Sequence, residues 1–373
     1  MKLNVLHVID HLGTGGAQSI LRDIFGSNKN NSKIFLFSLR RSPQNFNIEN
    51  ERCYLSKSQS KYNLVYLFKL KKFIKKHDIQ VLHCHLYKSQ IFGYFIKLLF
   101  LRKIKLIFHE HGQILAKSPS SFFNYLYKFF LRIAKHRVDF FIAVSKQVKE
   151  SLIEDANIQS AKIIILYNSI DGNKFDDRKK SCLKKINRDK FGLSFNDFAI
   201  GFASRIVDFK GWKTFIKAAM VLSKKQPNFK FFIAGTGEDC EDLLKIINKE
   251  NLKKSVKYLG NVTNMIEFYS ILDCLVIPSH WEGMGIVVLE AQVLSVPVIA
   301  SNVPALNEII THNKNGLLFK KKSSNDLVKM INYLYSNPKL ATKISISGLR
   351  KAQKFSIENY LKELNNIYEL LKI

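Results

Sequence analysis

Short apolar runs alternate with longer amphipathic stretches along the whole chain. The runs are rich in β-branched and aromatic residues and end near Gly, Ser, Asn or Pro, a pattern typical of strands. They occupy residues 4–9, 33–39, 81–83, 105–108, 140–144, 163–166, 198–203, 230–234, 256–259, 274–278 and 297–300. Segments of helical length lie between them, for example residues 17–25, 64–76, 211–224, 239–250 and 285–294. Apolar strands that alternate with helices predict an α/β protein with parallel sheets covered on both faces.

This alternation occurs twice and divides the chain into two halves. Residues 171–197 between the halves are polar, contain RKK and KK runs and have weak periodicity, so we expect an interdomain linker with a short helix. The length agrees, because 373 residues correspond to about two domains of ~150 residues each. We place one domain at residues 1–180, a second at 181–355 and a terminal helix at 356–373.

The terminal helix has an apolar stripe. Ser356 is a suitable N-cap, and the stripe consists of Leu361, Leu364, Tyr368 and Leu371. An amphipathic helix must bury such a stripe, and from the residues alone either domain could receive it.

Cysteine usage and hydropathy limit the class of protein. The five cysteines are scattered and never form a C-x-x-C pair, which excludes a disulfide scaffold and a zinc ribbon and is typical of a reducing cytoplasm. The N-terminal segment has no signal-peptide pattern, and no apolar run approaches the ~18 residues of a spanning helix. We expect a cytoplasmic protein that is soluble or peripheral on the inner face of the plasma membrane.

Positive charge is concentrated in the first half of the chain. The net charge is +29, and residues 61–137 carry sixteen Lys and Arg against two acids, interleaved with aromatic residues. Three interpretations remain: a solvated lysine face, docking on anionic lipid, or nucleic-acid binding. The chain has no helix-turn-helix, zinc-finger or RRM-type signature, so we expect no nucleic-acid partner. Residues 121–137 mix bulky apolar with basic residues, which fits either an interfacial helix or a buried helix with a charged edge.

The sharpest chemical motif is HWEGMGIVVLEAQ, at residues 280–292. Gly283 and Gly285 follow an apolar strand and open a helix, whose free N–H groups and positive dipole end suit a phosphate. Glu290 lies near enough on that helix to reach a sugar hydroxyl, and Glu282 precedes the helix and faces the crevice. The alternative is a glycine turn with two surface acids.

A second motif, SRIVDFKG at residues 204–211, follows another predicted strand. Arg205 as a fork and Lys210 as a point charge could together clamp a diphosphate. Gly237 belongs to a further strand-to-helix turn, at residues 235–238, whose glycines permit close backbone approach. Each motif alone is weak evidence.

The first half offers a glycine loop and two histidine pairs. The loop, residues 13–16, can touch phosphate or let another domain approach, but it is neither a Walker A loop nor a full G-x-G-x-x-G motif. His83 with His85, and His109 with His111, are i and i+2 pairs that point the same way on an extended strand. Such pairs suit Zn²⁺; alternatively, one histidine of each pair faces the cleft and the other packs.

These residues together resemble the family-4 retaining glycosyltransferases. The matching stretches are the Gly-Gly-Ala loop at 15–17, HCHL, FHEHG, AVS, YNSID, SRIVDFKG, AGTGE, YLGNV, the Glu282–Glu290 pair, NE at 307–308, NGLLF and FSIENY. The resemblance implies the GT-B architecture, in which two Rossmann-like domains face each other across a cleft and the last helix crosses back to the N-terminal domain.

The resemblance also implies site residues. The C-terminal domain would bind a nucleotide-diphosphate sugar and the N-terminal domain an acceptor. Arg205 and Lys210 would lie on the diphosphate, Glu290 on the ribose, and His111 on the reacting side of the donor sugar. The other donor contacts would come from Gly16, Gly237, Val262, Glu282, Gly283, Met284, Gly285 and Ile286.

We therefore expect a retaining hexosyltransferase with a UDP- or GDP-linked donor and a glycan acceptor, lipid-linked, in bacterial surface polysaccharide or lipopolysaccharide synthesis. Cations and a helix N-terminus supply the field for the leaving phosphate, so we expect no metal and no cofactor. The acceptor attacks from the front side, and the leaving phosphate helps to deprotonate it. The alternatives are a nucleotide-sugar epimerase of the same fold and a metal-dependent hydrolase that uses both histidine pairs.

Overall fold

The chain folds as two compact units. A computed structural model describes residues 3–13, 15–26, 32–41, 51–58, 64–112, 122–172 and 186–372. Unit 1 comprises Met1–Ser169 and Ile357–Ile373, and unit 2 comprises Ile170–Ser356. The boundary expected at residue 180 lies outside the described residues, as does much of the expected linker. Residues 186–190 of that linker are helical.

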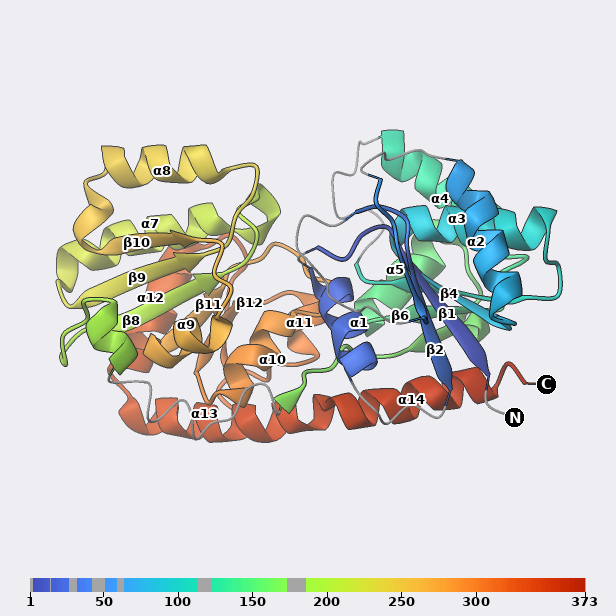
Figure 1. Ribbon diagram of the computed structural model, residues 1–373. Coiled ribbons are helices and arrows are strands. Elements are labelled where there is room, and N and C mark those ends of the chain that lie inside the picture. Colours follow the sequence, from blue (N-terminus) through green and yellow to red (C-terminus); the bar gives the residue numbers. More distant parts are fainter. Residues whose placement is uncertain are drawn as a thin grey trace. The chain divides into compact units, whose positions relative to one another are not determined.

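Unit 1 is built on a seven-stranded parallel sheet of order β3-β2-β1-β4-β5-β6-β7. Figure 1 labels β1, β2, β4 and β6 of this sheet. Its strands are β1 (Asn4–Ile9), β2 (Lys33–Ser38), β3 (Cys53–Leu55), β4 (Val81–His85), β5 (Lys105–Glu110), β6 (Phe140–Ala143) and β7 (Ile163–Ile165). The strand order reverses between β1 and β4, so their carboxyl ends form the switch point at which open α/β sheets bind ligands.

Helices connect these strands and cover the sheet. They are α1 (Gly16–Gly26), α2 (Val65–Lys76), α3 (Leu86–Leu99), α4 (Phe122–Ala134) and α5 (Lys146–Ala156). Right-handed crossovers put α2, α3, α4 and α5 on one face of the sheet and α1 on the other. Ser145 illustrates how the sequence starts such a helix, because its hydroxyl accepts the N–H of Val148 at the first turn of α5.

Unit 2 repeats this plan with a six-stranded parallel sheet of order β10-β9-β8-β11-β12-β13. Its strands are β8 (Phe198–Ala203), β9 (Phe229–Ala234), β10 (Val256–Gly260), β11 (Cys274–Ile277), β12 (Val298–Ser301) and β13 (Leu317–Phe319). Its helices are α7 (Trp212–Lys225), α8 (Cys240–Lys249), α9 (Met265–Ile271), α10 (Ile286–Val293), α11 (Pro304–Asn307), α12 (Ser324–Tyr335) and α13 (Pro338–Ala352). The switch point lies between β8 and β11.

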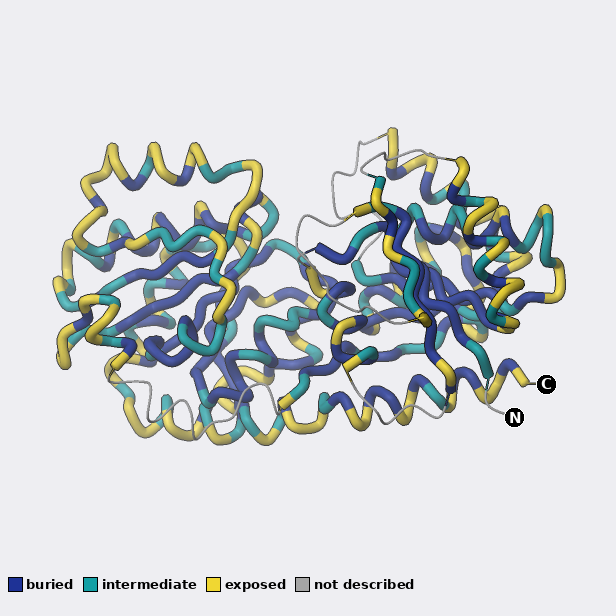
Figure 2. The backbone as a smooth tube through the Cα atoms, viewed as in Figure 1, coloured by how far each residue is buried: buried dark blue, intermediate teal, exposed yellow. Residues whose placement is uncertain are grey.

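Burial follows the expected layers. Strands in both units are dark in Figure 2, and the outward faces of the helices are yellow. Large buried side chains such as Trp212, Phe215 and Phe231 fill the core of unit 2 between sheet and helices. Strands buried on both faces explain why their sequences are almost continuously apolar. The prediction of two Rossmann-like parallel sheets is confirmed.

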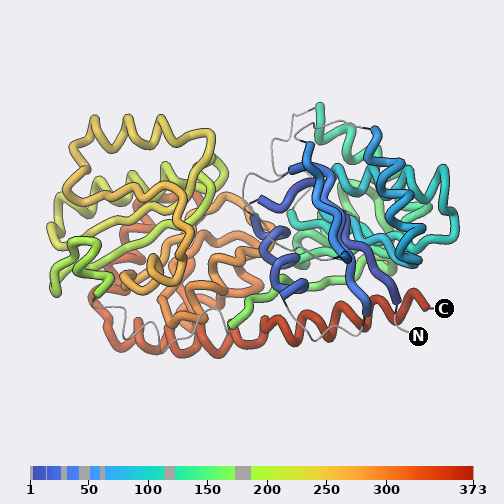
Figure 3. Tube along the Cα trace, viewed as in Figure 1, coloured from blue at the N-terminus to red at the C-terminus, as the bar shows by residue number. Residues whose placement is uncertain are grey.

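The last helix, α14 (Ile357–Glu369), belongs to unit 1 although it follows unit 2 in the chain. It contacts α1 and so lies on the α1 face of the sheet, with the red C-terminal segment beside blue N-terminal segments in Figure 3. Leu361, Leu364, Tyr368 and Leu371 are all buried, which confirms the predicted stripe. Of the two domains left open for this helix, the N-terminal one receives it.

Among the described residues, no helix is long and apolar enough to cross a membrane.

Candidate functional site

The structure brings together residues from the two predicted motifs of unit 2. Lys210 ends a short 3₁₀ turn after β8, and Glu282 lies in the loop between β11 and α10. Nζ of Lys210 donates to Oε1 of Glu282 at 2.6 Å, and Oγ of Ser279 donates to the same oxygen at 2.7 Å. Glu282 is only 9% exposed, so the alternative of a surface acid is wrong for this residue.

An aromatic pair supports the cations of this loop. The guanidinium of Arg205 and the ammonium of Lys210 lie 5.6 and 5.7 Å from the ring centre of Phe209. Phe209 in turn stacks on Trp281, with 4.5 Å between ring centres. Arg205 is exposed and makes no ion pair with any residue the structure describes, so its charge is open to an anion. The sequence analysis assigned no role to these two aromatic residues, although each lies within a predicted motif.

The glycine turn before α10 is shaped by its own neighbours. Gly285 caps the helix with a φ of 92°, in the left-handed region that favours glycine, and a Cβ there would lie 2.7 Å from Cδ2 of Leu306. Gly283 and Met284 are buried, and Ile286 begins the helix. In the first turn of α10, the N–H of Val288 donates to the carbonyl oxygen of Gly285 at 2.9 Å. The N–H groups of Ile286 and Val287 precede this bond, and free N–H groups at a helix N-terminus suit an anion.

Glu290 lies on the second turn of α10 and is held by a neighbour. The hydroxyl of Tyr269 donates to Oε2 of Glu290 at 2.7 Å. Burial and the adjacent carboxylate raise the pKa of Tyr269 well above its usual value, so the tyrosine remains a donor. Tyr269, which sequence reasoning missed, orients the carboxylate expected to bind ribose.

The glycines of the 235–238 turn serve contacts within the chain. A Cβ on Gly237 would lie 2.2 Å from the carbonyl oxygen of Ile206, and one on Gly235 would lie 1.8 Å from that of Ser204. These glycines therefore let the turn pack on the loop that carries Arg205. Val262, half-buried, follows the end of β10 at the same carboxyl edge.

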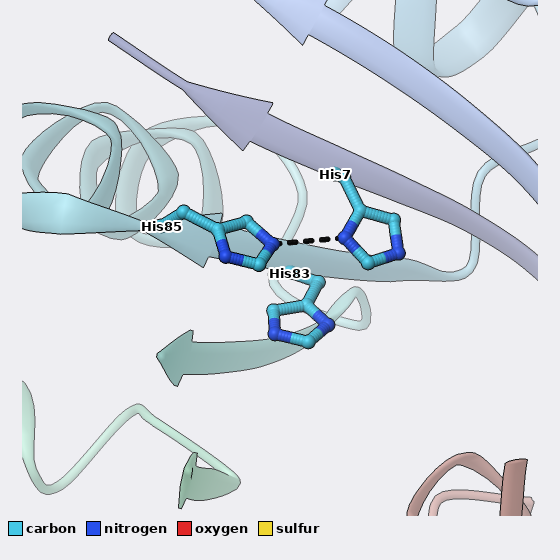
Figure 4. A group of neighbouring side chains, drawn as sticks. All are labelled: His7, His83 and His85. Atoms are coloured by element: carbon cyan, nitrogen blue, oxygen red, sulfur yellow. Dashed lines mark hydrogen bonds between the residues drawn. The ribbon is translucent and has the colours of Figure 1, made fainter. Parts of the chain in front are cut away.

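In unit 1, five imidazoles gather at the adjacent strands β1, β4 and β5. The register pairs His7 with His83 and His85 with His109, and His111 follows β5. We call His7, His83, His85, His109 and His111 the histidine cluster. Figure 4 shows three of its rings, with a hydrogen bond of 2.8 Å between Nδ1 of His7 and Nε2 of His85.

Burial makes this cluster uncharged. It lowers the pKa of both His7 and His111 to about 3, and those of the other three rings fall well below 6.5 through burial and neighbouring imidazoles. Glu110 lies on the opposite face of the sheet, where Tyr127 and Gln90 donate to it at 2.5 and 2.7 Å. The cluster consists of neutral hydrogen-bonding groups.

Two triads of the cluster could offer ligands to a metal ion. Atoms of His7, His83 and His85, and of His85, His109 and His111, lie within 4.8 Å of one another. The rings of His83 and His85 are stacked 4.4 Å apart, and those of His109 and His111 are stacked 4.2 Å apart. A metal binds in the plane of an imidazole, so one ion cannot lie in the planes of two stacked rings. Metal binding would require these rings to turn and break their hydrogen bonds.

Burial distinguishes His111 from the other members of the two pairs, because it is only half-buried. The sequence alternative, in which one histidine of each pair faces the cleft and the other packs, stays a prediction. His83, His85 and His109 are fully buried, and Nδ1 of His111 is buried as well. Both members of each pair lie on the same face, as predicted from their i, i+2 spacing.

The glycine loop of unit 1 precedes α1. Gly16 is the first residue of the helix and is exposed, while Thr14 lies outside the described residues. Asp10, at the end of β1, accepts two hydrogen bonds from Arg40 at 2.7 and 2.6 Å. This ion pair, which sequence reasoning missed, ties the end of β1 to the segment that follows β2.

A cavity of about 450 Å³ lies elsewhere in unit 1, and its lining includes Lys105 and Phe140. These residues begin β5 and β6, so the cavity lies at the amino ends of the strands, opposite the histidine cluster. Ligands of open α/β sheets bind at the carboxyl ends, and we assign this cavity no part in the site.

Helix α4 carries apolar side chains on its outer face. Its exposed members are Phe122, Phe123, Tyr125, Leu126, Phe129 and Ile133. Asn124, Tyr127, Leu131 and Ala134 form its buried face. The buried face agrees with one of the two interpretations of residues 121–137, a buried helix. The other, an interfacial helix, stays a prediction, and residue 121 lies outside the described residues.

Comparison with known proteins identifies two family models on successive parts of the chain. The model of glycosyl transferases group 1 matches residues 184–351, and that of Glycosyltransferase Family 4 matches residues 33–174. Together they cover most of both units.

Individual relatives are more distant. The chain is 28% identical over 255 residues to the capsular polysaccharide biosynthesis glycosyltransferase CapM of Staphylococcus aureus, covering 65% of this chain and 66% of that protein. It is 30% identical over 184 residues to the lipopolysaccharide core biosynthesis mannosyltransferase LpsB of Rhizobium meliloti, covering 46% and 51%. The chain spans about half to two thirds of the length of the curated relatives it matches.

The fold is shared over the full length. The structure of Anabaena HepE, in complex with UDP and glucose, matches with a TM-score of 0.83 at 20% identity and covers 98% of this chain and 99% of that one. With two matching family models and this two-sheet GT-B fold, the chain belongs to the group 1, family-4 type of glycosyltransferases.

Proposed function

We propose that the chain is a retaining hexosyltransferase that moves a sugar from a UDP- or GDP-linked donor to a hydroxyl of a lipid-linked glycan. The observation that carries this proposal is the cluster of Arg205, Phe209 and Lys210 at the switch point of unit 2. The HepE structures, in complex with UDP, glucose and UDP-glucose, support a nucleotide-sugar donor for a protein of this fold.

The proposed chemistry follows from charge. Breaking the bond between sugar and diphosphate leaves negative charge on the leaving phosphate and positive charge on the anomeric carbon. Arg205 has an open positive charge, and the N-terminus of α10 adds oriented N–H groups, so the leaving group can be stabilised without a metal. The acceptor then attacks from the front side, and the leaving phosphate takes its proton.

The remaining donor contacts are proposals of the same kind. Glu290, oriented by Tyr269, binds the ribose hydroxyls. Glu282, with Gly283, Met284, Gly285 and Ile286, surrounds the donor sugar and diphosphate. Gly237 and Val262 lie near the base. From unit 1 we assign His111 to the reacting side of the sugar and Gly16 to the phosphates.

The acceptor belongs to unit 1 in this proposal. The names of CapM and LpsB place two relatives in capsule and lipopolysaccharide synthesis, which supports a glycan acceptor of the bacterial surface. The exposed apolar face of α4, in a strongly basic segment, supports an anionic membrane surface as a partner.

The experiment that tests this function combines binding and turnover. Thermal-shift screening with nucleoside diphosphates and their sugars identifies the base, because a ligand of the native state raises the melting temperature. Incubation with that donor and a lipid-linked glycan extract should yield a product whose anomeric configuration, read by NMR, matches the donor.

Three outcomes would contradict it. Inversion of the anomeric centre would refute the retaining mechanism. An altered sugar nucleotide formed without acceptor would identify an epimerase. Activity that EDTA abolishes and Zn²⁺ restores would identify a metal enzyme.

A further inference from the structure

The histidine cluster is one continuous chain of hydrogen bonds that passes through a hydroxyl on helix α14. In its first arm, Nε2 of His111 lies 3.0 Å from Nδ1 of His85, and Nε2 of His85 lies 2.8 Å from Nδ1 of His7. Nε2 of His7 then lies 3.1 Å from the hydroxyl of Tyr368.

The second arm starts from the same hydroxyl. Tyr368 lies 2.8 Å from Nδ1 of His83, and Nε2 of His83 lies 3.1 Å from Nδ1 of His109. The two ends of the chain, Nδ1 of His111 and Nε2 of His109, are buried and have no partner among the described residues. A single hydroxyl therefore joins two arms of imidazoles.

Every bond in this chain runs from Nε2 of one ring to Nδ1 of the next, directly or through the hydroxyl. A neutral imidazole has one N–H and one lone pair, and a tyrosine hydroxyl has one proton to donate. If His111 carries its proton on Nε2, His85 must accept on Nδ1 and carry its own proton on Nε2, and so on along the chain. When the hydroxyl of Tyr368 donates one of its two bonds, all five bonds form only if all five rings have the same tautomer.

The chain thus has two polarities. It holds six protons, of which five occupy the hydrogen bonds. In one polarity the sixth proton lies on Nε2 of His109, and Nδ1 of His111 presents a lone pair. In the other polarity the sixth proton lies on Nδ1 of His111, which then donates.

We propose that the histidine cluster and Tyr368 form a hydrogen-bond relay that gives the five imidazoles one shared tautomer, and that Tyr368 is thereby a positioning residue for His111. The relay decides whether Nδ1 of His111 accepts or donates a hydrogen bond. Its catalytic consequence rests on the proposed function, because a sugar hydroxyl at His111 would meet either a lone pair or an N–H. The shared tautomer itself depends only on the geometry of unit 1.

The test reads the tautomers directly. In protein labelled with ¹⁵N-histidine, long-range ¹H–¹⁵N correlation distinguishes protonated from unprotonated ring nitrogens. Single replacements by Gln identify the signals of the five other histidines, His11, His77, His136, His280 and His312. We expect the Nε2–H fraction, which is the fraction of each ring that carries its proton on Nε2, to be the same in all five cluster rings at pH 7. Different fractions in the wild type would overturn the relay.

Removal of the hydroxyl that joins the two arms tests the role of Tyr368. Tyr368→Phe separates the arms, so the Nε2–H fraction of the His111 arm should differ from that of the His109 arm. Tyr360→Phe is the matched control, because its hydroxyl is buried on the same helix without a partner among the described residues. Equal fractions in both arms of Tyr368→Phe would refute the link, and if that variant fails to fold, the wild-type spectrum still decides the relay.

Turnover gives the second readout. Tyr368→Phe should lower kcat about tenfold, the scale of losing an outer partner of a functional histidine, with the KM for the sugar nucleotide unchanged. A loss of donor affinity with unchanged kcat would instead show a structural role. Because the NMR measurement needs no turnover, a shared tautomer in a protein without transferase activity would refute the proposed function and leave the relay intact.

Discussion

The ammonium of Lys210 lies 2.6 Å from a carboxylate oxygen of Glu282, although 72 positions separate the two residues. The side chains are 14% and 12% exposed, so the pair is largely withdrawn from water. Lys210 therefore faces the proposed diphosphate with its charge already balanced, whereas Arg205 does not. This difference assigns separate roles to two cations that the sequence suggested as one clamp.

Arg205→Ala should lower turnover about 100-fold, the usual scale for losing one charge contact to a transition state. The measurement is the initial rate at saturating donor. Lys213→Ala is the matched control, since Lys213 is an exposed cation near the same loop whose charge is paired with Asp208 at 3.0 Å. Near-normal turnover of Arg205→Ala would refute the proposed contact between Arg205 and the leaving diphosphate.

Glu282→Gln should separate binding from turnover. The amide preserves the shape of the side chain but removes the charge that balances Lys210. Without this partner, the charge of Lys210 is free to contact the diphosphate, and such a contact is worth about 1 kcal/mol. We therefore expect about fivefold tighter binding of a nucleoside diphosphate, measured by calorimetry. Transfer should nevertheless fall, because the proposed contact with the donor sugar is lost.

The control for this variant is Glu267→Gln, which removes an acid from the exposed pair with Lys190. It should leave both nucleotide affinity and turnover unchanged. Weaker binding of the diphosphate to Glu282→Gln would show that the carboxylate supports the anion site in another way.

Acid should destabilise unit 1 through the histidine cluster. His7 and His111 have folded-state pKa values of about 3, against 6.5 in the unfolded chain. Below pH 6.5 the unfolded state therefore binds more protons than the folded state. The stability that the two neutral imidazoles contribute is complete above pH 6.5 and is lost as the pH falls towards 3. Each group contributes a slope of up to about 1.4 kcal/mol per pH unit.

Urea unfolding at pH values from 7.5 to 5 measures this effect. The free energy of unfolding should be nearly constant down to about pH 6.5 and then fall. His7→Gln removes one of the groups and should have a shallower slope. A wild-type protein as stable at pH 5 as at pH 7.5 would contradict the burial of neutral imidazoles.

The two buried tyrosines of α14 should differ in their effect on stability. Tyr368→Phe leaves Nε2 of His7 and Nδ1 of His83 without a partner, and each unsatisfied buried group costs about 1–3 kcal/mol. Tyr360→Phe removes a hydroxyl that has no partner among the described residues, so it should be neutral or stabilising. Denaturation curves of the two variants test this, and equal losses would contradict the bonding of Tyr368.

Local pattern was sufficient for much of this fold. Apolar runs with turn residues at their ends located nearly all strands, and the i, i+2 spacing predicted that paired histidines share a face. The strands β3 (Cys53–Leu55) and β13 (Leu317–Phe319) were missed, because each has only three residues at a sheet edge and is too short to give a periodic signal.

The site could not be completed from local pattern, because its contacts depend on strand order. His7 reaches the two histidine pairs only because β1 lies beside β4 in the sheet, and Tyr368 meets His83 across 285 positions. Similarly, Phe209 and Trp281 come together because β8 and β11 are neighbours. Single-sequence periodicity holds no information on such pairings.

The exposed apolar face of α4 leads to the last prediction, binding to anionic membranes. Phe122 and Phe129 are 74% and 55% exposed, and exposed apolar groups on a helix in a basic segment favour the lipid interface. Two cations of α4, Lys128 and Arg132, contact Asp155, so we expect the aromatic residues to supply much of the affinity.

Flotation with vesicles of phosphatidylglycerol and phosphatidylcholine measures this binding at low salt. The double variant Phe122→Ser and Phe129→Ser should lose most of the bound fraction. Phe195→Ser is the matched control, because Phe195 is 99% exposed in unit 2, far along the chain from α4. Equal flotation of the wild type, the double variant and Phe195→Ser would show that the lysines alone bind the membrane. If the wild type does not float, the basic segment is a solvated lysine face.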